Sequence, residues 1–174
     1  IFDHYGLPFV LSCFTQQPAQ WVQQIFPQLC LTENRDSADY VYLAEKLKTF
    51  AGKKLQKKRN HLNAFYRDYA GRWSYETLDE HNVAECEAFL KQWHAEDPDA
   101  FLQQERRGVF RILKLLGTIP YRGGLIRIDG QVKAFAIGSW LSPRMCQENI
   151  EKADDEIRGL YQVILKEWLT HEFD

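Results

Sequence analysis

The sequence predicts an α+β fold in which helices flank a mixed β-sheet. Apolar residues recur with helical spacing from residue 47 to residue 70. The stretch 123–140 has the pattern of a β-hairpin, with apolar runs on both sides of the turn dipeptide Asp129-Gly130. The last expected helix, 159–173, is apolar around more than half of its circumference and should be buried. A chain that contains both helical spacing and a β-hairpin pattern favours a fold in which helices pack on a sheet.

The first 45 residues contain too little predicted structure for a complete domain. Residues 9–14 (FVLSCF) have the composition of a strand, and residues 18–29 that of a short helix after a turn. Residues 33–37 predict a turn. The stretch 38–43 predicts either a strand or an extended connection.

From residue 72 onward, strand and helix patterns alternate in a definite order. The expected elements are a strand at 72–78, helices at 82–93 and 100–116, strands at 123–128, 132–140 and 145–152, and the helix at 159–173. Gly123, Gly124 and Gly138 fall inside the expected strands, where glycine serves backbone conformation or a close approach rather than chemistry.

Composition excludes several classes of protein. No apolar run approaches the ~18 residues of a membrane span, and the N-terminal residues do not have the pattern of a signal peptide. The four cysteines are widely spaced without a CxxC pair, which indicates reduced thiols rather than disulfides or a metal site. We therefore expect a cytoplasmic or membrane-peripheral protein of unknown oligomeric state. Met145 is the only methionine, so we interpret the chain as a piece of a longer protein.

Positive charge is concentrated in one segment. Residues 46–72 carry nine Lys or Arg against one Asp, about +8, whereas the whole chain is −2. Such asymmetry favours an anionic partner for the 52–69 helix: a nucleic acid, a lipid headgroup or a phosphate. A merely solvated helix is the alternative.

Two of these charges are expected to face inward. At ~100° per residue, the apolar side chains of this helix fall within an arc of roughly 100°. They are Leu55, Leu62, Phe65, Tyr66 and Tyr69. Lys58 falls inside this arc and Arg59 close to its edge. Either both side chains extend along the core with their charges at its margin, or they meet an anionic ligand in a cleft.

Three segments, 52–69 (GKKLQKKRNHLNAFYRDY), 122–141 (RGGLIRIDGQVKAFAIGSWL) and 149–168 (NIEKADDEIRGLYQVILKEW), closely resemble the family named for the C-terminal domain of phosphatidylglycerol lysyltransferase. The resemblance implies two tandem GNAT-like units related to the Fem peptidyltransferases. It makes residues 1–45 the C-terminal remnant of a first unit, and residues 46–174 a second unit truncated at its C-terminus.

The resemblance also implies a donor. The KKRN run, Lys57, Lys58, Arg59 and Asn60, resembles the basic helix that relatives use toward the acceptor end of a charged tRNA. Aminoacyl-tRNA and acyl-CoA are therefore the candidate donors. The loop at 153–161 has one glycine and three acids, where acetyltransferases of this superfamily have a glycine-rich pyrophosphate loop, so acetyl-CoA is disfavoured although Arg158 remains.

Acyl transfer needs a base for the attacking group and a stabiliser for the oxyanion. Glu151 is the expected base, with Asp154 as a second acid, and Lys152 is the expected stabiliser. Because adjacent strand residues point to opposite faces, only Glu151 or Lys152 should face the cleft, and we favour Glu151. A helix-entry turn with solvated charges is the alternative.

Four further residues complete the expected site. Tyr161 and Gln162 could bind polar groups of a substrate, although packing is the stronger expectation for Tyr161. Asn149 stands where the resemblance expects a histidine; it can hydrogen-bond but cannot carry a proton. Glu105 could pair with Arg59 or Lys58, or form a surface ion pair with Arg106.

Two functions remain open. The chain is an acyl- or aminoacyltransferase that acts on a lipid headgroup, a peptide or a small amine. Alternatively, it is a non-catalytic module whose basic helix binds RNA or an anionic membrane.

Overall fold

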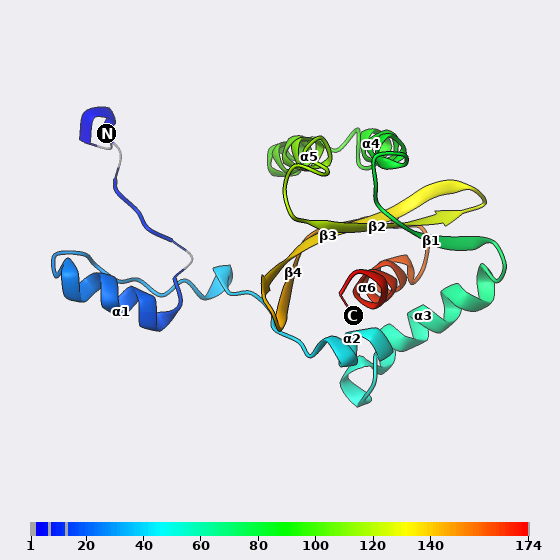
Figure 1. Cartoon of the computed structure of the whole chain (residues 1–174), viewed down its shortest axis with the longest axis horizontal. Coiled ribbons are helices and arrows are strands. Elements are labelled where there is room, and N and C mark those ends of the chain that lie inside the picture. The colour runs from blue at the N-terminus through cyan, green and yellow to red at the C-terminus, as the bar shows by residue number, and fades with distance from the viewer. Residues whose placement is uncertain (1–2, 7, 13, 174) are drawn as a thin grey trace. The chain divides into compact units, whose positions relative to one another are not determined.

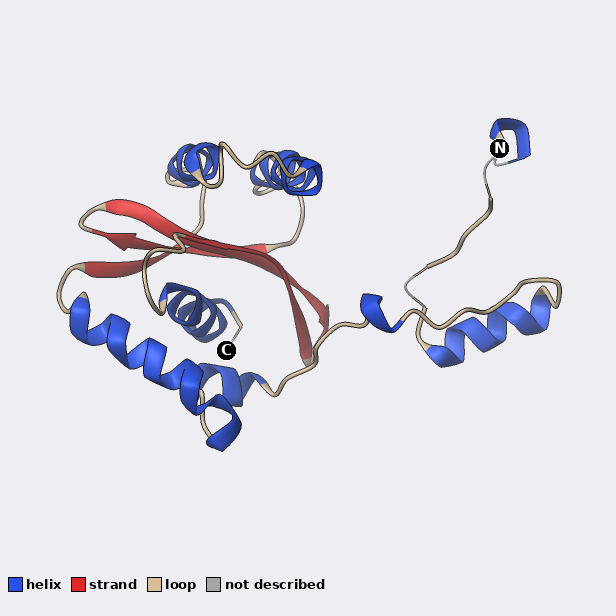
Figure 2. Cartoon of the chain, turned by 180° about the vertical axis from the view of Figure 1, so that it is seen from behind, coloured by secondary structure: helices blue, strands red, loops and turns tan. Residues whose placement is uncertain are grey.

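The computed structural model describes residues 3–6, 8–12 and 14–173. The chain divides into two compact units, residues 1–41 and residues 42–174. Each unit is described by itself. Figures 1 and 2 show their elements. No helix in the described part of the chain is both long and apolar enough to cross a membrane.

The first unit contains one α-helix and no strand among its described residues. Helix α1 (Gln16–Ile25) has no buried residue, and 3-10 turns occur at Asp3–Tyr5 and Arg35–Ser37. The expected strand at 9–14 is wrong for residues 9–12 and 14, while Cys13 lies outside the described residues. A strand pairs with another strand, and no described residue of this unit is in strand conformation. Residues 38–43 form an extended connection.

The second unit contains the sheet. Its helices are α2 (Ala44–Thr49), α3 (Gln56–Asp68), α4 (Val83–Gln92), α5 (Ala100–Leu113) and α6 (Leu160–Glu172). Its strands are β1 (Trp73–Thr77), β2 (Arg122–Ile128), β3 (Gln131–Ser142) and β4 (Met145–Ala153). The strands follow the order β1-β2-β3-β4, each antiparallel to its neighbour. The α+β class is therefore confirmed, and each pair of neighbouring described strands is antiparallel, so the sheet is antiparallel rather than mixed as expected.

Helices cover both faces of the sheet (Figure 1). Helices α4 and α5 lie on one face, where Leu90, Leu113 and Phe135 are fully buried. Helix α6 lies on the other face, with α2 and α3 packed against it. Trp168 of α6 is fully buried, and its indole N–H donates to the Arg122 carbonyl at 3.2 Å. Alternation along β3 separates the two cores, since Ala136 belongs to one and Phe135 to the other.

The expected helix 47–70 is interrupted. Helix α2 ends at Thr49, Phe50 takes a left-handed conformation with φ of 47°, and Gly52 has φ of 94°. A 3-10 turn at Lys53–Leu55 then leads into α3. The break places the fully buried Phe50 side chain in the core beneath α6. A helical period continues through this break, so periodicity alone does not reveal it.

Candidate active site

Two adjacent charged residues of β4 point to opposite faces of the sheet. Glu151 pairs with Ala136, which belongs to the core beneath α6, whereas Lys152 pairs with Phe135, which belongs to the core beneath α4 and α5. This arrangement confirms the alternation expected for an undistorted strand end. The two side chains therefore have separate surroundings.

Lys152 is surrounded by partners. Its side chain is only 6% exposed, and its Nζ lies 2.8 Å from Glu105 Oε1 and 4.4 Å from the centre of the Trp93 ring. The expectation that Glu105 pairs with Arg59 or Lys58, or with Arg106, is therefore wrong. Helix α5 presents Glu105 to the sheet face opposite α3. A buried ammonium held by a carboxylate and an aromatic ring is a structural element rather than a free catalytic group.

Glu151 lacks such partners. Its Oε1 atom is inaccessible to solvent and accepts no hydrogen bond from any residue that the structure describes. Burial, and after it the negative charge of Glu148, raises the pKa of Glu151 to about 8, while Lys58 and Lys152 act weakly in the opposite direction. A carboxyl group with a pKa near neutrality and an unsatisfied oxygen is suited to accept a proton.

Glu148 belongs to the same site, although sequence reasoning missed it. The pairing of β3 with β4 shifts between Ile137 and Gly138, because Ile137 faces Ile150 and Gly138 faces Glu148. Asn149 is the extra residue, and the Ser139 hydroxyl donates to its Oδ1 at 3.3 Å. The bulge reverses the alternation, so Glu148 shares the face of Glu151. Strict alternation would have placed them on opposite faces.

Two of the three acids of the loop before α6, Asp154 and Asp155, are engaged in the fold. Asp154 Oδ2 lies 3.1 Å from Lys133 Nζ, and Asp154 Oδ1 accepts the backbone N–H of Glu156 at 3.2 Å. Asp155 lies 2.7 Å from His94 Nε2 and accepts the Tyr161 hydroxyl at 3.1 Å. The structure thus gives Asp154 a cationic partner that Glu151 does not have.

A shallow pocket of about 340 Å³ opens beside this loop. Its lining includes His61, Arg158, Tyr161 and Gln162. Gly159, the residue just before α6, has φ of 88°, and a Cβ there would collide with the His61 carbonyl, so glycine permits the close approach of α3. Burial and the charge of Asp155, with a smaller effect of Glu151, raise the pKa of Tyr161 to about 12. Glu151 does not line this pocket, but its charge acts on Tyr161, which does.

Lys58 and Arg59 of the basic helix have different surroundings. Lys57, Lys58 and Asn60 are exposed, and the charge of Lys58 acts on the Glu151 carboxyl group. Arg59 is half-buried, and its Nη1 donates to the carbonyls of Phe50 at 2.6 Å and Gly52 at 3.5 Å. Arg59 therefore holds the break between α2 and α3, and does not reach a cleft.

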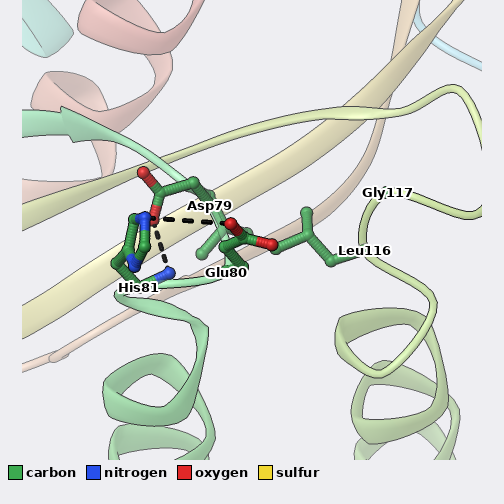
Figure 3. Close-up of a pocket in the computed structure, with 6 residues that line it drawn as sticks. Asp79, Glu80, His81, Leu116 and Gly117 are labelled. Carbon is green, nitrogen blue, oxygen red and sulfur yellow. Dashed lines mark hydrogen bonds and ion pairs between the residues drawn. The ribbon is translucent and has the colours of Figure 1, made fainter.

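A second pocket, of about 320 Å³, lies where β1 leads into α4 (Figure 3). It is lined by Asp79, Glu80, His81, Leu116 and their neighbours. Asp79 Oδ1 accepts the backbone N–H of His81 at 2.8 Å and that of Asn82 at 3.2 Å. These bonds close a turn just before α4, which begins at Val83, so the fold already uses the Asp79 carboxylate.

These features define an α+β protein with an unpartnered acid on the edge strand of its sheet. The chain belongs to the family described as phosphatidylglycerol lysyltransferase, C-terminal, whose model matches residues 1–174. It is 32% identical over 151 residues to an uncharacterised protein of Mycoplasmoides gallisepticum, covering 84% of this chain and 47% of that protein.

A crystal structure with a similar fold is that of a conserved protein of unknown function from Bacteroides thetaiotaomicron. The TM-score is 0.81 and the identity 28%, covering 90% of this chain and 54% of that chain. The chain thus spans about half the length of both relatives. The likeness covers the fold, whereas the names of the two relatives carry no activity.

Proposed function

We propose that the chain is part of a GNAT-like acyltransferase or aminoacyltransferase in which Glu151 is the general base. The observation that carries this proposal is the Glu151 carboxyl group, buried in the sheet with one oxygen unpartnered. The order β1, two helices, three antiparallel strands and α6 supports the GNAT-like assignment. The family name supports a transferase that modifies lipids.

The chemistry assigned to Glu151 is a proton transfer. As the acceptor's amine or hydroxyl attacks the ester or thioester carbonyl, its proton passes to Glu151. The new bond to the acyl carbon forms, the bond to the leaving oxygen or sulfur breaks, and that atom takes up a proton. Tyr161 and Gln162, on the first turn of α6, are the groups that would orient the polar parts of the substrate.

The donor would be anionic. Lys53, Lys54, Lys57 and Lys58 are exposed on one continuous stretch of chain, where they can meet the phosphates of an aminoacyl-tRNA or of acyl-CoA. Of the three loop acids near α6, Asp154 is paired with Lys133, so its charge opposes an anion less than the sequence suggests. We expect the protein in the cytoplasm or at the membrane periphery.

The test is Glu151→Gln in the full-length protein. Transfer is measured from radiolabelled aminoacyl-tRNA, and separately from acyl-CoA, to vesicles containing phosphatidylglycerol and to small amines. We expect the variant to lose at least ~100-fold in rate, as removal of a general base does, while the fold and donor binding stay intact. Glu96→Gln, at an exposed loop position, is the matched control. Undiminished turnover of Glu151→Gln would remove Glu151 from the mechanism.

The exposed lysines also favour a second candidate function, a non-catalytic module that binds RNA or an anionic membrane. In that case, donor RNA would bind to the wild type and to Glu151→Gln alike, and no acceptor would be modified. The same assay therefore distinguishes the two candidates.

A further inference from the structure

We infer that Glu148 is the positioning partner of Glu151, and that the bulge at Asn149 exists to bring the two carboxyl groups onto one face, where they share a single proton. This inference rests on the proposed function, since Glu151 would be the group that uses the proton. It adds a residue that does not itself contact the reacting atoms.

The register of the sheet carries the argument. Gly138 pairs with Glu148 and Ala136 pairs with Glu151, and residues 136 and 138 lie on the same face of β3. That face packs on α6, because Ala136 belongs to the α6 core and a Cβ on Gly138 would collide with the Trp168 ring. Both glutamates therefore start from the α6 side of β4.

The bulge is built into its surroundings. A Cβ on Gly138 would also collide with the Gln147 carbonyl, so only glycine opposite the bulge leaves room for the displaced backbone. Ile150, directly after the bulge, is 8% exposed and is anchored in the core on the other face. The register is thereby fixed on both sides of Asn149, and the distance between the two glutamates along the strand cannot slip.

The charges around Glu148 and Glu151 favour a state in which the two carboxyl groups together hold one proton rather than none. Lys58 from α3 and Lys152 from the opposite face of β4 attract the ionised form of Glu151, and Tyr161 of α6 feels its charge. Beside Glu148 lies Cys146, which Lys48 of α2 reaches with its charge. None of these cations bonds to Glu151 Oε1, which is buried. Two carboxylates on one face then repel, and a shared proton relieves that repulsion.

The two glutamates differ in exposure. Glu148 reaches the surface, yet loss of water raises its pKa to about 7, whereas Glu151 is partly buried and its Oε1 has no accessible surface. We therefore assign the larger rise in pKa to Glu151, with loss of water as the main cause and the charge of Glu148 as the second. Glu148, at the solvent side, is the route by which the shared proton reaches water.

The experiment titrates the glutamate carboxyl carbons by ¹³C NMR in the folded chain, in the wild type and in Glu148→Gln, Glu151→Gln and Glu96→Gln. We expect Glu148→Gln to lower the titration midpoint of Glu151 by about one pH unit or more, and Glu151→Gln to lower that of Glu148. Glu96→Gln should move neither. In the transfer assay, the pH profile of Glu148→Gln should shift to lower pH by a similar amount.

An unchanged Glu151 midpoint in Glu148→Gln would overturn the inference, even if Glu151→Gln abolishes transfer. Mutual shifts without any transfer by the wild type would support the shared proton and overturn the proposed function alone. The titration requires no substrate, so the two failures are distinguishable.

Discussion

Glu151 and Lys152 are neighbours in one strand, yet the fold treats them in opposite ways. Lys152 has a carboxylate at 2.8 Å and an aromatic ring at 4.4 Å, both supplied by the helices that cover its face. Glu151 has an inaccessible oxygen that receives no hydrogen bond from the described residues. The difference separates a buried charge that the fold satisfies from a carboxyl group with one oxygen left without a partner among the described residues.

The comparison also explains why the sign of a charge alone is a poor guide to function. Lys152 looked like a stabiliser of an oxyanion, but Glu105 and Trp93 already neutralise and cover it. Asp154 looked like a second acid, but Lys133 holds it. Glu151 differs from both because its cationic neighbours, Lys58 and Lys152, act on it only through space.

The largest effect is expected when the ion pair between Lys152 and Glu105 is broken. Lys152→Met keeps the length of the side chain but removes the charge that holds Glu105. We expect a loss of about 3 kcal/mol in the free energy of unfolding, at the low end for a broken buried pair because Glu105 can turn to water. Urea denaturation measures it, with Lys91→Met, at an exposed position of α4, as the control. A loss no greater than in the control would mean that the pair contributes nothing to stability.

A smaller effect, a gain in stability, is expected when Glu151 is replaced. The pKa of Glu151 is raised in the folded state, so ionisation of this carboxyl group lowers the free energy of unfolding. This loss is absent below the unfolded pKa, near 4.5, and grows as pH rises toward about 8. Glu151→Gln cannot ionise, so the variant does not lose stability in this way. Between pH 5 and pH 9 we therefore expect the variant to gain on the wild type by on the order of 2 kcal/mol.

Thermal or urea unfolding at several pH values checks this prediction. Glu96→Gln should run parallel to the wild type at every pH, because Glu96 is exposed. A constant difference between Glu151→Gln and the wild type across this range would show that Glu151 does not carry a raised pKa.

Local sequence patterns predicted much of the sheet and of its covering helices. The Asp129-Gly130 turn joins β2 and β3 where it was expected, and α6 occupies the buried position that its apolar circumference indicates. These features succeed because turn chemistry and helical period are properties of short stretches. The alternation in β4 likewise separated Glu151 from Lys152 correctly.

The features that the sequence did not reveal depend on residues distant in the chain. The bulge at Asn149 is set by Gly138 on the neighbouring strand and by Trp168 above it, so Glu148 could not be placed from β4 alone. The partner of Glu105 comes from a different sheet face than the one expected. The break at Phe50 depends on the core beneath α6, and the described residues of the segment 9–14 are not in a strand.

The smallest effects are expected in the basic helix, where Lys58 and Arg59 are neighbours in sequence but have different surroundings, as residues 151 and 152 of β4 do. Arg59 is bound to the Phe50 and Gly52 carbonyls, whereas Lys58 is exposed. Arg59→Ala should therefore cost about 1 kcal/mol of stability, because the carbonyls at the end of α2 lose a donor. Lys58→Ala should leave stability unchanged and weaken tRNA binding severalfold, with a lower salt dependence.

Filter binding of tRNA at two salt concentrations, together with urea denaturation, separates these outcomes. Lys53→Ala serves as the control for a diffuse charge effect, since Lys53 is exposed but has no charge coupling to Glu151. Equal losses of binding for Lys53→Ala and Lys58→Ala would mean that the helix attracts anions only through its summed charge. A greater loss for Lys58→Ala would locate the anion beside Glu151, because Lys58 is the cation of α3 whose charge reaches that carboxyl group.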